Sequence, residues 1–106
     1  SAMTNNDYIY SALYSSNPNI DSEFKANCVA VLIATQHLSS GLPINMLYAA
    51  YQISFGSSGF LDAPEHKEYV CDIVFTLLDG GPEDVEAFEG EVAYIIRRLN
   101  GERQDN

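Results

Sequence analysis

The sequence is poor in basic residues. Its 106 residues include five Lys and Arg against fifteen Asp and Glu, which gives a formal net charge of -10 at pH 7. Proteins that bind DNA, RNA or an anionic membrane surface need a cluster of cations to neutralise phosphate groups. The bases of this chain cluster only at Arg97, Arg98 and Arg103. We therefore expect no direct binding to nucleic acid and none to a membrane.

The sequence also lacks a long apolar run. The longest one, residues 28–34, is much shorter than the roughly 18 to 20 residues that cross a bilayer. Ser1 and Ala2 precede Met3 and resemble the remnant of an expression tag, so they are set aside in the fold prediction. We expect a soluble, cytoplasmic protein, with a periplasmic or secreted location as the alternative if a signal peptide has been removed.

Cysteine is rare, with two residues in the chain. Cys28 and Cys71 both have apolar neighbours, which favours reduced thiols that pack as small hydrophobic side chains. One disulfide between two helices in an oxidising compartment is the alternative, because the spacing of the cysteines does not exclude it.

Known catalytic and metal-binding motifs are missing. His37 and His66 are far apart and belong neither to a HExxH motif nor to a paired Cys/His pattern. The chain has no GxSxG motif, no P-loop, and no acidic loop with the glycine that an EF-hand needs. We expect no catalytic residue, no metal and no cofactor, and therefore a protein that is not an enzyme.

The sequence does contain enough apolar side chains to fold. Hydrophobic residues make up 46% of it, with five Phe and seven Tyr, which is typical of a globular domain. Apolar spacings of three and four, interrupted by Gly, Pro, Asn and Ser, predict helices. We expect an all-α, compact single-domain bundle of about five helices over residues 1–106, with 101–106 as a frayed tail. The expected helices cover 6–15, 22–39, 43–55, 64–79 and 82–99.

Two of these helices have an unusually large share of apolar side chains. The helix over 22–39 is apolar on every side from 28 to 34, which predicts that it is the central one, and Asp21 is its expected N-cap. The helix over 43–55 has two apolar faces. One consists of Ile44, Leu47, Tyr48, Tyr51 and Phe55, and the other of Met46, Ala49, Ala50 and Ile53. The simpler interpretation buries both faces inside the domain; the alternative is a homodimer contact through Met46, Ala50 and Ile53.

Negative charge is concentrated near the C-terminal end. Residues 60–92 contain ten acids and one base, Lys67. In a helix over 64–79, the side chains of Glu65, Glu68, Asp72 and Asp79 share one narrow arc, which we call the acidic ridge. Its like charges, three and four residues apart, destabilise the helix by about 0.2 to 0.5 kcal/mol per pair. Tyr69 and Phe75 border the ridge, and Val70, Ile73, Val74 and Leu77 lie opposite it. An ordinary solvated helix face is the alternative explanation.

Gly90 is placed unusually, in the middle of the helix expected over 82–99. A glycine there costs about 1 kcal/mol relative to alanine. The 3-4 spacing of Val85, Phe88, Val92, Ile95 and Leu99 predicts a buried stripe, and Gly90 falls opposite it. We expect Gly90 to face outward with Ala87 and Tyr94, as a shallow seat for a partner. A tolerated weakness of the surface, or close contact with another helix of the same domain, would also explain it.

These observations favour a non-catalytic acidic module that binds a basic protein. Immunity proteins, antitoxins and inhibitors that imitate the charge of nucleic acid are candidate classes. A homo-oligomeric structural or assembly subunit is the alternative, and a small-molecule site lined by Tyr48, Tyr51 and His37 is a third. The residues expected to contact the partner are Glu65, Glu68, Tyr69, Asp72, Asp79, Glu83, Glu86, Ala87, Glu89, Gly90 and Tyr94, with Phe75 beside them.

Overall fold

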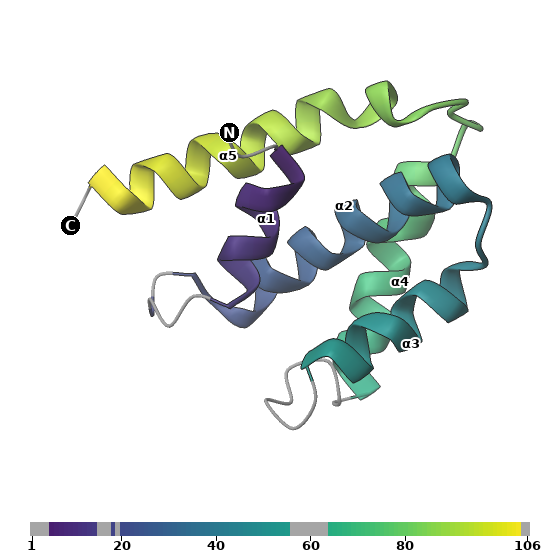
Figure 1. The fold of residues 1–106 in the computed structure, drawn as a ribbon, viewed down its shortest axis with the longest axis horizontal. Helices are drawn as coiled ribbons and strands as arrows, with labels where there is room; N and C mark the ends of the chain where they lie inside the picture. Colours follow the sequence, from purple (N-terminus) through teal and green to yellow (C-terminus); the bar gives the residue numbers. More distant parts are fainter. Residues whose placement is uncertain (1–4, 15–17, 19, 56–63, 105–106) are drawn as a thin grey trace.

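A computed structural model describes residues 5–14, 18, 20–55 and 64–104, without the side chains of 5, 6, 55, 64 and 102–104. The described part contains α1 (Asn5–Leu13), α2 (Ser22–Ser40), α3 (Ile44–Phe55), α4 (Pro64–Leu78), a short 3-10 turn η2 (Val85–Phe88) and α5 (Glu89–Gln104) (Figure 1). The Cα radius of gyration is 13.5 Å, close to the roughly 13 Å of a compact domain of about 100 residues. The predicted all-α bundle of five helices is confirmed.

The centre of the bundle is α2, which packs against α1, α3, α4, α5 and η2. Every side chain from 28 to 34 is buried, so the prediction made from this apolar run is confirmed. Asp21 caps the helix because its Oδ1 accepts a 2.8 Å hydrogen bond from the Phe24 N–H. Gly41, with φ at 74°, ends it in the left-handed region and donates its N–H to the His37 carbonyl. Cys28 is buried and Cys71 half-buried, and both are free thiols.

Tyrosine side chains join α1 and α3 across α2. The hydroxyls of Tyr10 and Tyr51 are 2.8 Å apart, and Gln36 Nε2 donates to the Tyr51 hydroxyl at 3.0 Å. Tyr48 is also buried, and the His37 ring nitrogen Nδ1 is held 2.8 Å from the Leu42 carbonyl. The hypothesis of a small-molecule site lined by these residues therefore gains no support. The tyrosines fill the core, and His37 holds the turn after α2.

The second apolar face of α3 corrects one expectation. Met46 is 56% exposed and Ile53 81%, and Ala49 and Ala50 are exposed as well. Leu47, Tyr48 and Tyr51 on the other face are buried as predicted, while the Phe55 side chain lies outside the described residues. Burial of both faces inside the domain was wrong, because α3 packs mainly on α2 and its far side is left to solvent.

The last helix differs at both of its ends from the helix predicted over 82–99. Its α-helical part begins at Glu89, after η2, so Gly90 lies in the first turn of α5 and not in the middle of a helix. Val85 opens η2 and is 41% exposed, whereas Phe88, Ile95 and Leu99 of the predicted stripe are buried. The helix continues to Gln104, beyond the end predicted at Leu99, while 105 and 106 lie outside the described residues.

Candidate protein-binding surface

Three acids of the acidic ridge, Glu65, Glu68 and Asp72, lie on the solvent side of α4, and Asp79 follows directly after its end. Glu65, Glu68, Asp72 and Asp79 are all exposed, as their spacing predicts, and Val70 and Val74 on the opposite side are buried. Within the part of the chain that the structure describes, no ion pair joins any of these four carboxylates to Lys or Arg. Lys67, the one base in this region of the sequence, places its Nζ 5.9 Å from the centre of the Tyr48 ring on α3. The ridge therefore keeps an unneutralised negative potential.

The aromatic residues beside the ridge have different environments. Phe75 is 61% exposed and Tyr69 36%. The Tyr69 hydroxyl donates a 3.2 Å hydrogen bond to Oε1 of Glu23, at the start of α2. Partial desolvation, together with the nearby Glu23 charge, raises the pKa of Tyr69. Glu23 and Glu65 border the same surface cavity, so a carboxylate from α2 extends the acidic surface that the sequence placed on later helices alone.

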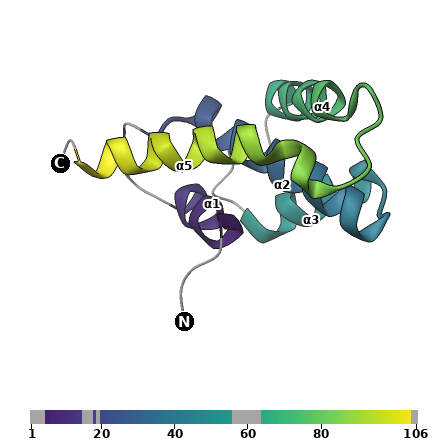
Figure 2. The same ribbon diagram turned by 90° about the horizontal axis from the view of Figure 1, so that it is seen from above.

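A groove separates α4 from α5. Seen from above, α4 lies on one side of α5 and α1 on the other (Figure 2), and α4 and α5 make little direct contact among the described residues. The groove has a volume of about 370 Å³. Phe24, Asn27 and Val31 of α2 form its floor. Its walls are formed by Ile73 and Leu77 of α4 and by Gly90, Glu91, Tyr94 and Ile95 of α5.

A second cavity continues this groove toward the end of α4. It has a volume of about 330 Å³ and shares Leu77 and Glu91 with the first. Asp79 and Ala87 line it, together with the buried Phe88. We call the two cavities together the α4–α5 groove. It brings together four residues that the sequence analysis assigned to the site, namely Asp79, Ala87, Gly90 and Tyr94.

Two other predicted residues lie on the opposite flank of α5. Glu86 and Glu89 line a separate cavity of about 620 Å³ with Thr35, Gln36 and Ser39 of α2. They are exposed, but they do not border the α4–α5 groove. The predicted surface is therefore divided into the ridge, the groove and this far flank. Glu91, which the sequence analysis counted among the acids but did not assign to the site, is the carboxylate that lies beside Gly90.

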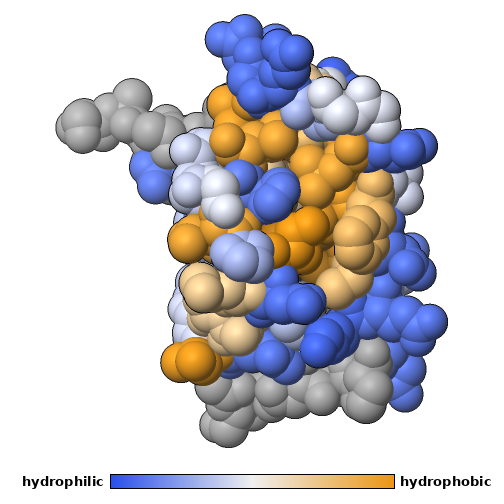
Figure 3. Space-filling view, turned by 90° about the vertical axis from the view of Figure 1, so that its right-hand side faces the viewer, coloured by the Kyte–Doolittle hydropathy of each residue, from blue (hydrophilic) through white to orange (hydrophobic). Residues whose placement is uncertain are grey.

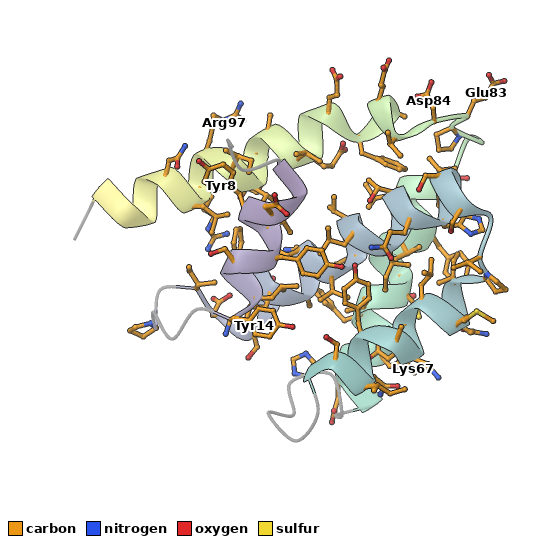
Figure 4. The ribbon with its side chains drawn as sticks, viewed as in Figure 1. Tyr8, Tyr14, Lys67, Glu83, Asp84 and Arg97 are labelled. Carbon is orange, nitrogen blue, oxygen red and sulfur yellow. The ribbon has the colours of Figure 1, made fainter. Side chains whose placement is uncertain are left out.

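The loop between α4 and η2 adds two exposed acids. Glu83 and Asp84 project outward at the upper right of Figure 4. Asp84 caps the 3-10 turn, since its Oδ1 accepts a 3.1 Å hydrogen bond from the Glu86 N–H. Arg97 projects from a later part of α5 (Figure 4), and the Arg98 guanidinium carbon lies 4.6 Å from the centre of the Phe24 ring. Neither arginine forms an ion pair with these two acids among the described residues.

Gly90 is exposed, which agrees with its predicted position. Among the residues that the structure describes, a Cβ atom at this position would have no atom of another part of the protein within 4 Å. Close packing against another helix of the domain is therefore the wrong explanation for this glycine. What remains is an open, side-chain-free position on the wall of the groove, next to Tyr94, which is 53% exposed.

Metal-binding and membrane-spanning features are not found in the described part of the chain. No group of three or more His, Cys, Asp or Glu side chains is placed to hold a metal ion within the described ranges. None of the helices described is both long and apolar enough to cross a membrane. No family model, curated protein or solved structure matches the chain.

Proposed function

We propose that this chain is a non-catalytic module that binds a basic protein through its acidic surface. The observation that carries the proposal is the set of exposed ridge carboxylates without a basic partner among the described residues. Such a potential attracts a cationic surface, speeds association and selects its orientation. A toxin-neutralising immunity protein, an antitoxin, or an inhibitor that imitates nucleic acid would work in this way.

Charge alone gives little affinity at an exposed surface, so the proposal also needs residues that lose water on binding. Phe75 and Tyr94 supply them, because each is a large, exposed aromatic beside the acidic residues. Tyrosine is enriched among the residues that dominate binding energies, since it offers a rigid apolar ring and a polar hydroxyl. The expected interface thus combines charge for speed with a few aromatic contacts for affinity.

The test is capture of a partner followed by charge reversal. Tagged protein incubated with an extract of the cells that encode it should retain a protein with a pI above about 9, less of it as salt rises. With that partner purified, Asp72→Lys should slow association at low salt by at least about tenfold. Asn45→Lys is the control for the new cation because it adds a Lys to the uncharged α3; it changes the net charge by one unit, where Asp72→Lys changes it by two. Retention that is insensitive to salt and to Asp72→Lys would contradict the proposal.

A second candidate function, self-association, is favoured by the exposed face of α3. Met46, Ala49, Ala50 and Ile53 form an exposed apolar stripe on a helix that contains no charged residue. Two copies of a chain with a net charge of -10 repel each other, and an uncharged face is where that repulsion is weakest. Figure 3 shows that hydrophobic side chains also gather on the face at the right-hand side of Figure 1, with hydrophilic side chains among them.

Sedimentation velocity at increasing protein concentration tests self-association. We expect a dimer that Ile53→Asp converts to monomer, because the substitution buries a charge at the most exposed apolar position of the stripe. Asn100→Asp, which adds the same charge to an exposed position of α5, should leave the dimer in place. A wild-type chain that sediments as a monomer at about millimolar concentration would remove this candidate and leave the basic partner as the function.

A further inference from the structure

We propose that the α4–α5 groove receives an amphipathic basic helix of the partner, whose apolar side chains enter the groove while its Lys or Arg side chains pair with Glu91 and Asp79. The inference rests on the proposed function and specifies the part of the surface that gives affinity. It assigns the acidic ridge to the attraction of the partner and the groove to its recognition.

The walls of the groove decide which kind of segment fits. In the first cavity both walls and the floor are helices, whose backbone groups are largely hydrogen-bonded within each helix, and the second cavity adds residues of the loop after α4 and of η2. An extended peptide would lose water from its own N–H and C=O groups and find few backbone partners there. A helical segment brings its backbone bonds with it and needs only side-chain contacts, which is the usual way in which a helix binds a groove.

The two adjoining cavities of the groove can receive side chains from successive turns of such a helix. The two cavities, of about 370 and 330 Å³, adjoin at Leu77 and Glu91. Side chains one turn apart on a helix have Cβ atoms about 5–6 Å apart and face the same way. One apolar side chain can therefore contact Phe24 and Ile73 in the first cavity while the next contacts Phe88 in the second.

The charge of the groove selects a basic helix. Glu91 borders both cavities and Asp79 borders the second. Both carboxylates are exposed, and neither is paired with Lys or Arg in the described part of the chain. An acidic helix would bring like charges beside them, and an uncharged one would leave them partly desolvated without a partner. A helix with Lys or Arg beside its apolar stripe satisfies both carboxylates.

Gly90 lets the partner approach the wall. Because it has no side chain, and no described residue from another part of the protein lies within 4 Å of where its Cβ would be, a helix can lie close to the backbone of α5 at this point. Tyr94 follows one turn later on the same wall, so an aromatic ring borders the open position. This arrangement explains a glycine in the first turn of α5 without invoking a tight turn, since its backbone is helical.

A designed peptide tests the groove even while the natural partner is unidentified. The probe is a helical peptide of roughly 15 residues with blocked termini, which has Leu along one face of the helix and Lys along the other. In two-dimensional amide NMR spectra, its addition should shift the signals of Ile73, Leu77, Glu91 and Tyr94. Gly90→Phe, which fills the groove with the chain's own ring, and Glu91→Lys should each weaken binding at least about tenfold.

The controls separate groove binding from general attraction and from misfolding. Glu86→Lys makes the same charge change as Glu91→Lys but on the other flank of α5, and it should bind the probe as the wild type does. Gly90→Ala adds one methyl group to the wall of the groove and should weaken binding less than Gly90→Phe does. A probe with Ser in place of Leu keeps the charge and should leave the groove signals unshifted. Circular dichroism checks that Gly90→Phe is folded, and Glu91→Lys supplies an independent answer if it is not.

The outcomes distinguish the groove from the proposed function. Three results would overturn the groove proposal. The probe shifts amide signals of α3 only, Glu86→Lys weakens probe binding as much as Glu91→Lys does, or about millimolar probe shifts no signal. A captured basic protein that binds Asp72→Lys weakly but binds Gly90→Phe as tightly as the wild type would also overturn the groove proposal. It would leave the proposed function standing. Failure to capture a basic protein in a salt-dependent manner would count against the proposed function, whatever the probe does.

Discussion

Replacing Phe24 with alanine should lower the free energy of unfolding by about 3 to 5 kcal/mol. The ring is 2% exposed, lies in the core of the bundle and forms part of the floor of the α4–α5 groove. The substitution removes the apolar surface that the ring buries and leaves a cavity beside α2 that the neighbouring helices fill only partly. It also removes the ring against which the Arg98 guanidinium packs, at 4.6 Å from its centre. Urea unfolding followed by circular dichroism at pH 7 measures the loss.

Phe75→Ala is the matched control for this substitution. It removes the same side chain from α4, but at a position that is 61% exposed. Surface substitutions away from special features usually change stability by less than about 0.5 kcal/mol. Equal losses for the two variants would show that Phe24 is not a core residue and would contradict the packing of α2 described above. Since domains are stable by about 5 to 15 kcal/mol, Phe24→Ala would leave a marginal protein and Phe75→Ala a normal one.

The position of Phe24 in the core illustrates what the sequence predicts well. An apolar run between a capping aspartate and a glycine identified α2 and its burial from 28 to 34, because a helix that is apolar on all sides has no stable place except the centre. The solvent side of α4 was equally predictable, since four acids on one arc cannot be buried without partners. Each of these predictions depends on the residues of a single helix and not on the arrangement of its neighbours.

The start of α5 was mispredicted because two start signals compete there. Pro82 is well suited to a first helical turn, and the prediction began the helix at that point. In the structure Asp84 is the N-cap of η2, the 3-10 turn before α5, with extended backbone at φ -151° and ψ 174°. An extended residue at 84 interrupts a helix that starts at 82, so the chain turns only at Val85. Gly81, with φ at 70°, further separates α4 from this start.

The division of the acidic surface could not be read from single helices. A count of angles along α5 places Glu86 near Gly90, as both face outward. Whether they border the same groove depends on where α4 lies, and α4 packs on α2 beside one flank of α5 only. The bond between Tyr69 and Glu23 was equally beyond reach, because it joins residues 46 positions apart on different helices. Burial or exposure of the second face of α3 likewise depended on its neighbours.

Raising the pH from about 9 to about 12 should destabilise the fold strongly, because the buried Cys28 thiol and Tyr51 hydroxyl lose their protons more readily in the unfolded chain than in the core. Burial raises the pKa of the Cys28 thiol from 9.0 to about 12, although Arg98 lowers it in part. Burial and the hydrogen bond between its hydroxyl and that of Tyr10 raise the pKa of Tyr51 as well. The folded state thus binds these protons more tightly than the unfolded state does. Their contribution to stability is complete below pH 9 and is lost as the pH rises through the folded pKa values.

The contribution of Cys28 is on the order of 4 kcal/mol at most, since one pKa unit corresponds to about 1.4 kcal/mol. Cys28→Ala should lower stability at pH 8 through the lost packing, but its stability should fall less steeply than that of the wild type between pH 9 and 11. Cys71→Ala is the control, because this thiol is half-buried and the nearby Lys67 opposes the rise in its pKa, so the slope should change less. The readout is the slope of unfolding free energy against pH, which cancels the packing loss of each variant. Parallel slopes for the wild type and Cys28→Ala would mean that Cys28 ionises in the folded chain as readily as in the unfolded one. That result would contradict the complete burial of this thiol in α2, because burial disfavours the charged thiolate.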